Sequence, residues 1–240
     1  MITFNSERVL PDVLQALAWC DEIVIVDSGS TDCTLGIAGR FGCRVIHRAF
    51  DGFGAQKGFA VTQASHDWVL VVDADEIVTP ELRDEMRQRV GREKAVGYAV
   101  PISLVFLNKL MRYGGEYKMP HLRLFNRQYG NYNTNRVHED VVLNGPVARL
   151  QNHMLHHSYG SLHEYFEKFN RYTTAGARDL ASRQKKGSLV QVVFRLPITF
   201  FKEYILKLNL LNGYPGFLWS LFSAMYPVVK YAKLREMQKG

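Results

Sequence analysis

The chain has 240 residues, of which 47% are hydrophobic and 22% are charged. This is the composition of a globular protein with a sizeable core, and it excludes a disordered chain. The three cysteines, Cys20, Cys33 and Cys43, form no Cys-x-x-Cys pair, so neither a disulfide framework nor a zinc site is predicted, and a reducing cytoplasm is expected. We expect no N-terminal signal segment, and no apolar run reaches the roughly 18 residues that a membrane span needs.

The net charge of +7 comes from the C-terminal part of the chain. Residues 1–184 contain 21 basic and 21 acidic residues, whereas residues 185–240 contain nine basic and two acidic residues. This distribution argues against a nucleic-acid groove in the main body of the protein. It predicts that the C-terminal segment meets an anionic surface.

The first part of the chain alternates between apolar strands and amphipathic helices. Residues 1–4 have the pattern of the end of a strand whose beginning lies outside the sequence. Further strands are predicted over 22–27, 43–47 and 68–72, and helices over 9–19, from about 33 onward and over 54–65. This alternation predicts an α/β fold with a mostly parallel sheet and right-handed crossovers.

The pattern changes after a helix that Thr79 is expected to cap and Pro80 to begin. Short strands are predicted over 98–104, 122–125, 137–143 and 147–155. From Ser161 the sequence is helical to its end, beginning with a capping box formed by Ser161 and Glu164. We therefore expect two domains, 1–160 and 161–240.

Three carboxylates, Asp73, Asp75 and Glu76, follow directly on the apolar run 68–72. Ligands of α/β sheets bind where the strands end, so these side chains are expected at the mouth of a site. Asp73 and Asp75 can turn to the same side, and such oxygen ligands suit Mg²⁺ or Mn²⁺ with a phosphorylated substrate. Asp27 ends a second buried strand, as a nucleotide crevice requires. The alternative is a solvated acidic turn.

The ordered set of motifs resembles the inverting family 2 glycosyltransferases with the GT-A fold. Residues 26–32, 52–57 and 73–76 carry this resemblance. Residues 122–125, 137–139 and 155–159 are similar to the subgroup that contains the lipopolysaccharide core β-1,4-glucosyltransferases acting on heptose. The resemblance covers nearly the whole chain. It departs from the family pattern in the short first strand and at Gly58, where such proteins often carry Asn.

The resemblance implies a donor role for four residues. Asp27 would hold the uracil or ribose, Asp73 the ribose or metal, and Asp75 the Mg²⁺ or Mn²⁺ that bridges the diphosphate and so stabilises the leaving group. Lys57 would contact phosphate or base, with a solvated helix lysine as the alternative.

Further roles concern residues in the second half of the chain. Arg123 is a candidate clamp for phosphate or acceptor, or else part of a structural ion pair. His156 matches a late histidine that serves as an extra metal or phosphate ligand. An inverting transfer needs a base for the acceptor hydroxyl, and the resemblance favours Glu139, with Asp140 in reserve. A plain acidic pair at a strand edge is the alternative.

The C-terminal segment interleaves its lysines with aromatic residues. They are Phe194, Phe200, Phe201, Tyr204, Phe217, Trp219, Phe222, Tyr226 and Tyr231. This composition predicts binding in the plane of an anionic membrane surface, on the inner face of the cytoplasmic membrane. Helices packed on the catalytic domain are the alternative.

The expected function is therefore transfer of a hexose, by resemblance glucose from UDP-glucose, onto a heptose of the lipopolysaccharide inner core. Two alternatives stay open. One is sugar transfer to a polyprenyl phosphate, whose acceptor oxygen is already anionic. The other is a non-catalytic membrane-bound scaffold, against which the carboxylates Asp73, Asp75 and Glu139 count.

Overall fold

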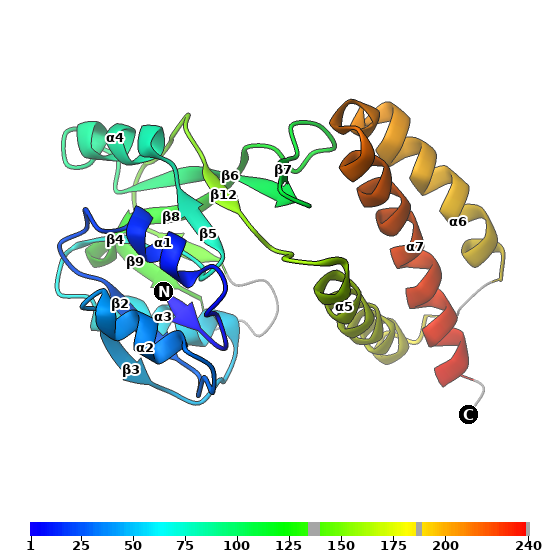
Figure 1. The fold of residues 1–240 in the computed structure, drawn as a ribbon, viewed down its shortest axis with the longest axis horizontal. Coiled ribbons are helices and arrows are strands. Elements are labelled where there is room, and N and C mark those ends of the chain that lie inside the picture. Colours follow the sequence, from blue (N-terminus) through cyan, green and yellow to red (C-terminus); the bar gives the residue numbers. More distant parts are fainter. Residues whose placement is uncertain (134–139, 186–188, 239–240) are drawn as a thin grey trace. The chain divides into compact units, whose positions relative to one another are not determined.

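The computed structural model describes residues 1–133, 140–185 and 189–238 (Figure 1). The chain divides into two compact units. The first, which we call the N-terminal unit, contains Met1–Ser103 and Lys118–His157. The second, the helical unit, contains Leu104–Tyr117 and Ser158–Gly240. Each unit is described by itself below.

Three parallel strands form the first sheet of the N-terminal unit. They are, in spatial order, β1 (Ile2–Thr3), β2 (Val24–Asp27) and β3 (Arg44–His47). The helices that follow them in the chain are α1 (Leu10–Ala16), α2 (Thr34–Arg40) and α3 (Phe53–Gln63). The parallel register places Asp27 between Thr3 and His47. The buried strand β2 therefore ends in a carboxylate, as the sequence predicts.

The second sheet is mixed, with the order β4, β8, β6, β12, β5 and with β7 and β11 paired to β6. Its strands are β4 (Trp68–Leu70), β5 (Glu76–Val78), β6 (Gly97–Phe106), β7 (Lys109–Leu110), β8 (Met119–Asn126), β11 (Val147–Arg149) and β12 (Met154–His156). A short 3-10 turn, η1 (Arg127–Tyr129), precedes an antiparallel pair of β9 (Gly130–Tyr132) and β10 (Val141–Leu143). The antiparallel pairing of β5 with β12 sets Glu76 opposite His156.

The predicted α/β class is confirmed, but one strand is placed differently. The sequence predicts that the strands ending at Asp27 and Asp73 share one parallel sheet. Instead β4 pairs antiparallel with β8, and β2 belongs to the other sheet. An apolar run that is buried on both faces does not reveal the direction of its neighbour, which explains the difference.

Helix α4 (Pro80–Arg89) buries its apolar face in a core cluster to which α1 contributes Val13. Helix α4 begins as predicted, because the Thr79 side-chain oxygen accepts a hydrogen bond from the Leu82 backbone N–H at 3.3 Å. Leu82 and Met86, one turn apart, are buried together with Val13 of α1. Burial of each such side chain contributes about 1.5–3 kcal/mol to folding.

The helical unit has the predicted helical C-terminal region. Helix α5 (Leu162–Ser182) begins at Ser161, whose Oγ accepts a hydrogen bond from the Glu164 N–H at 3.1 Å. The Glu164 carboxylate accepts one in turn from the Gly160 N–H at 2.7 Å, so both halves of a capping box are present. The later elements are α6 (Leu189–Phe201), the π turn η2 (Lys202–Leu206), the 3-10 turn η3 (Asn209–Asn212) and α7 (Tyr214–Met237).

Aromatic side chains of α7 form the core of this unit. Phe222 is buried and its ring lies 5.0 Å from that of Tyr165 in α5. Trp219 lies 5.3 Å from the ring of Phe106. The sequence analysis counts Trp219 and Phe222 in a membrane-binding set, whereas the structure uses them for packing. In the described part of the chain, no helix has the length and apolar character to cross a membrane.

Candidate active site

Asp73 lies just beyond β4 and is held by two cations from other elements. Lys57 of α3 is buried, and its Nζ lies 3.0 Å from Asp73 Oδ1. Arg123 of β8 donates from Nη2 to Asp73 Oδ2 at 2.8 Å. Burial disfavours the charged carboxylate, but Arg123 and Lys57 outweigh burial and hold the pKa of Asp73 far below its usual range. Asp73 is therefore a fixed anion between two fixed cations.

Glu76 closes the same network from β5. Its Oε1 accepts a hydrogen bond from Arg123 Nη2 at 2.9 Å, and its Oε2 accepts one from the Asp73 backbone N–H at 2.9 Å. The side chain is 1% exposed. Burial, and then the nearby Asp73 charge, raise the pKa of Glu76, while Arg123 opposes them. We call Lys57, Asp73, Glu76 and Arg123 the charge network.

Arg123 has hydrogen-bond donors beyond those that bind Asp73 and Glu76. Tyr132 of β9 is hydrogen-bonded to it, although burial dominates and raises the pKa of Tyr132 to about 12. The Arg123 Nε atom is buried and has no hydrogen-bond partner among the described residues. Arg123 thus forms ion pairs with both carboxylates and keeps one donor for a further acceptor, and its role as a clamp for phosphate or acceptor stays a prediction.

Asp75 and His156 form a second, more accessible pair. Their Oδ2 and Nε2 atoms are 3.4 Å apart, and the side chains are 31% and 34% exposed. The pairing of β12 with β5, together with a 2.8 Å hydrogen bond from the His157 N–H to the Asp75 carbonyl, holds the two segments together. Burial lowers the pKa of His156, but the Asp75 carboxylate reverses this and the net pKa is raised.

A carboxylate and an imidazole at this distance suit Mn²⁺ or Mg²⁺ as two of its ligands. Within residues 1–133, 140–185 and 189–238, no group of three or more His, Cys, Asp or Glu side chains is arranged to hold a metal ion. A cation bound at Asp75 and His156 would therefore take its other ligands from substrate phosphates and water, as Mg²⁺ commonly does.

Asp27 is buried and fully engaged by the chain itself. Its Oδ1 accepts hydrogen bonds from the hydroxyls of Thr3 and Ser30 at 3.0 and 2.5 Å, and its Oδ2 accepts from the N–H groups of Gly29 and Ser30, both at 2.8 Å. Although burial opposes ionisation, these donors lower the pKa of Asp27. Its carboxylate shapes the turn after β2, where Gly29 has φ 96°. Its contact with uracil or ribose stays a prediction.

The structure describes only one of the two candidate bases. Glu139 lies outside the described residues. Asp140 is exposed directly before β10, where its carbonyl accepts a hydrogen bond from the Asn133 N–H at 2.9 Å. Which of them is the base stays a prediction.

Three residues in or near the charge network, Glu76, Tyr132 and His121, were not predicted to have a role from the sequence. Glu76 meets Arg123 only because β5 and β8 share a sheet, and Tyr132 comes from a separate strand pair. His121 lies two residues before Arg123 on β8, but the pairing with β6 shifts register at Arg123, so simple alternation along the strand does not predict that the two side chains are neighbours. Burial and the Arg123 charge lower the pKa of His121.

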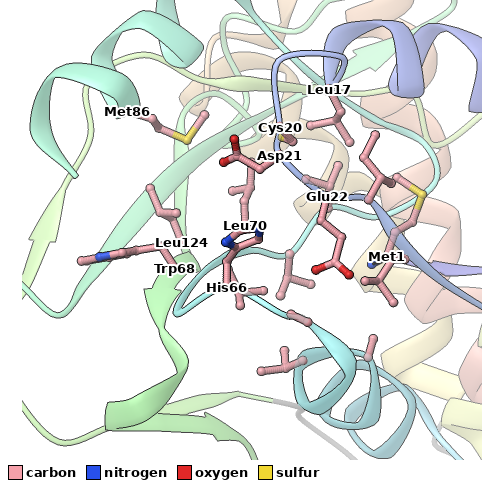
Figure 2. A pocket seen from close by; sticks show the side chains of 18 of the residues that line it. Met1, Leu17, Cys20, Asp21, Glu22, His66, Trp68, Leu70, Met86 and Leu124 are labelled. Carbon is pink, nitrogen blue, oxygen red and sulfur yellow. Dashed lines mark hydrogen bonds between the residues drawn. The ribbon is translucent and has the colours of Figure 1, made fainter. Parts of the chain in front are cut away.

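A separate cavity of about 360 Å³ lies between β2 and β4 (Figure 2). Figure 2 shows Trp68, Met86 and Leu124 on one side of it and Met1 and Glu22 on the other. Its lining is mostly apolar and contains only Lys57 of the charge network. Ligand sites for nucleotides need several convergent polar groups, so we place the candidate active site at the carboxylates and not in this cavity.

Comparisons with known proteins show what the chain is similar to. The model of glycosyl transferase family 2 matches residues 1–160. An uncharacterized glycosyltransferase of Rickettsia typhi is 31% identical over 99% of this chain and 86% of its own length. The lipopolysaccharide core biosynthesis glycosyltransferase LpsC of Rhizobium meliloti is 28% identical over 98% of this chain and 90% of its own length.

Among solved structures, S. aureus TarS 1–349 in complex with UDP has a TM-score of 0.50 at 15% identity, covering 99% of this chain and 89% of that one. A likeness at this identity concerns the fold alone. Together with the family match, it confirms the predicted GT-A fold.

Proposed function

Because the chain belongs to glycosyl transferase family 2, we propose that it is an inverting enzyme that transfers glucose from UDP-glucose to a heptose of the lipopolysaccharide inner core. The observation that carries the proposal is the charge network beside the accessible pair of Asp75 and His156. The name of the relative LpsC supports a lipopolysaccharide core acceptor.

The donor is expected to bind with its diphosphate at the accessible pair. In the charge network two carboxylates balance two cations, so the network holds its shape without a ligand. Asp75 and His156 face outward enough to meet a ligand, with Asp73 as the second candidate ligand. A bound Mn²⁺ or Mg²⁺ would supply positive charge where the leaving diphosphate becomes more negative. The Nε of Arg123, which has no hydrogen-bond partner among the described residues, is a further donor that the network offers to an anion.

The acceptor side requires a base. The acceptor hydroxyl oxygen forms a bond to the anomeric carbon while the bond from that carbon to the diphosphate oxygen breaks, and the hydroxyl proton passes to a carboxylate. Attack opposite the leaving group inverts the anomeric configuration. We assign the proton to Glu139, with Asp140 in reserve. We place the enzyme peripherally on the inner face of the cytoplasmic membrane, where its basic C-terminal segment meets anionic lipid.

The test is an incubation with a panel of sugar nucleotides and truncated core lipopolysaccharides, in which nucleoside diphosphate release is followed with and without chelator. We expect release with UDP-glucose and a heptose-terminated core, and loss of release in chelator. Release of nucleoside diphosphate with polyprenyl phosphate alone would identify polyprenyl phosphate as the acceptor. Full activity in chelator would contradict the metal role.

Two variants assign the residues. Glu139→Gln should lower kcat by about 10²–10⁴-fold, because the transition state loses its base, while donor affinity is kept. Asp75→Ala should remove the response to Mn²⁺, whereas the exposed Asp67→Ala serves as a matched control and should keep it. Near-normal turnover of Glu139→Gln together with a collapse in Asp140→Asn would make Asp140 the base.

A further inference from the structure

The chain from the second half of α6 through the turns η2 and η3 to the start of α7 carries many large exposed apolar side chains. Figure 1 shows α6 and α7 side by side. We call residues 194–217 the apolar turn. Its exposed members are Phe194, Leu196, Ile198, Phe201, Ile205, Leu206, Leu208, Leu210, Leu211, Tyr214 and Phe217. Leu206 and Tyr214 are 65% and 68% exposed. So many large exposed apolar side chains within one segment are rare on a water-exposed surface unless something binds them.

The interior of the same turn is polar. Asn209 and Asn212 are 0% and 1% exposed. Asn212 Nδ2 donates to Asn209 Oδ1 at 2.9 Å, and Asn209 Nδ2 donates to the Glu203 carbonyl at 3.1 Å. Leucines therefore face outward and amides face inward, which inverts the arrangement expected of a segment surrounded by water. This inversion indicates that the natural surroundings of the turn are apolar.

Hydrogen bonds hold the turn in this arrangement. Asn212 Oδ1 accepts from the Arg112 N–H at 3.1 Å, and Asn212 Nδ2 also donates to the Tyr113 carbonyl at 3.1 Å. The Gly114 N–H donates to the Lys207 carbonyl at 2.9 Å. The glycine pair after Tyr113 is thus anchored to the turn within the helical unit. The outward direction of the leucines is built into the fold.

Exposed basic residues accompany the exposed apolar side chains in the helical unit. Lys109, Lys202 and Lys207 are exposed, and Lys207 is the only charged residue between positions 205 and 217. Lys207 pairs with Glu203 at 2.8 Å, while Arg195 lies 4.7 Å over the ring of Tyr231. An apolar centre with a cationic rim matches a bilayer that has apolar chains beneath anionic headgroups.

We propose that the apolar turn inserts into the headgroup and upper acyl region of an anionic bilayer, with its leucines among the chains and its lysines at the phosphates. The proposal rests on the membrane location in the proposed function but is independent of donor and acceptor. The sequence predicts that an aromatic face along residues 189–231 binds the membrane, whereas this proposal assigns membrane binding to one end of the helical unit. It also makes apolar insertion, and not charge alone, the main source of affinity.

The test measures binding of the full chain to vesicles of equimolar phosphatidylethanolamine and phosphatidylglycerol. The triple variant Phe201→Ser, Leu206→Ser, Leu211→Ser should lose at least about 100-fold in affinity, since each buried methylene contributes roughly fourfold. A matched triple variant of exposed apolar residues in the N-terminal unit, Tyr129→Ser, Val142→Ser, Val147→Ser, should bind like the parent. High salt should weaken parent binding without abolishing it.

A second measurement keeps the proposal testable if the triple variant unfolds. In Leu211→Trp, fluorescence should be quenched by lipids brominated in the acyl chains, whereas Val147→Trp should show no added quenching over the parent. Absence of that quenching, unchanged affinity of a folded triple variant, or complete loss of parent binding in high salt would each overturn insertion. A parent dimer that the triple variant dissociates, without vesicle binding, would instead identify a second copy as the occupant.

Discussion

Both compact units bury polar side chains, and one group in each unit can be compared. The N-terminal unit buries Lys57, Glu76 and most of Arg123, whose charges meet around Asp73. The helical unit buries the neutral amides of Asn209 and Asn212. Charges must be paired when they leave water, and a guanidinium that is already paired can still offer a donor to an anionic ligand.

Burying a neutral amide costs less free energy than burying a charge, and it has another effect. Asn209 and Asn212 satisfy backbone groups of neighbouring turns, so the chain can bend while its leucines point outward. The comparison teaches that buried polarity serves a chemical site in one unit and shapes an apolar surface in the other. The predictions that follow test this difference, beginning with the largest effect.

Removing the guanidinium should be the most damaging change. Arg123→Met leaves Asp73 and Glu76 close together, with Lys57, which is paired to Asp73, as the remaining cation of the network. Loss of one partner of a buried pair costs about 3–5 kcal/mol. Urea unfolding, followed by a probe in the N-terminal unit, measures the loss. Arg83→Met, which removes an exposed partner of Asp84, is the control and should change stability by less than about 0.5 kcal/mol. A loss below about 1 kcal/mol for Arg123→Met would show that the charges are not truly buried.

Removing the Asn212 amide should destabilise the protein less than removing the Arg123 guanidinium. Asn212→Ala strips partners from the Arg112 N–H, the Tyr113 carbonyl and Asn209, which should destabilise the helical unit by about 1–3 kcal/mol. Thermal unfolding monitored in the helical unit gives the value, with the exposed Asn144→Ala as control. If the two variants behave alike, the amides do not shape the turn.

The smallest effect should come from exchanging a charge for an amide in the N-terminal unit. Glu85 accepts hydrogen bonds from the N–H groups of Gln151 and Asn152 and from Arg89. Burial opposes its charge, but these donors outweigh burial and lower the pKa of Glu85. Glu85→Gln should therefore cost about 1 kcal/mol at neutral pH.

The pH dependence of the stability lost in Glu85→Gln follows from the direction of the Glu85 pKa shift. A lowered pKa gives stability that is present above the unfolded-state pKa, about 4.3, and disappears as the pH falls through the folded-state pKa. The difference between parent and Glu85→Gln should accordingly shrink in acid. A difference that stays constant from neutral pH into acid would mean that the charge of Glu85 contributes nothing beyond its shape.

The sequence predicts the parts of the site that lie close together in the chain. Asp73 and Asp75 follow an apolar run, and strand ends collect ligands, so their position was predictable. The meeting of Arg123 with Glu76 was not, because it depends on which strands of the mixed sheet become neighbours. The apolar turn was missed for a related reason. Composition shows aromatics and lysines together, but only packing separates Trp219 and Phe222, which lie in the core, from Leu206 and its exposed neighbours.

The pairing of β5 with β12 has a consequence for the order of folding. Asp75 and His156 stand far apart in the chain and meet through this pairing. Closing so long a loop is slow and entropically unfavourable, so the pair should form late. A donor and cation that bind this pair would favour the native state over the unfolded chain by mass action. Substrate would then protect a long-range contact of the N-terminal unit against opening, and the enzyme should be hardest to unfold while it is loaded.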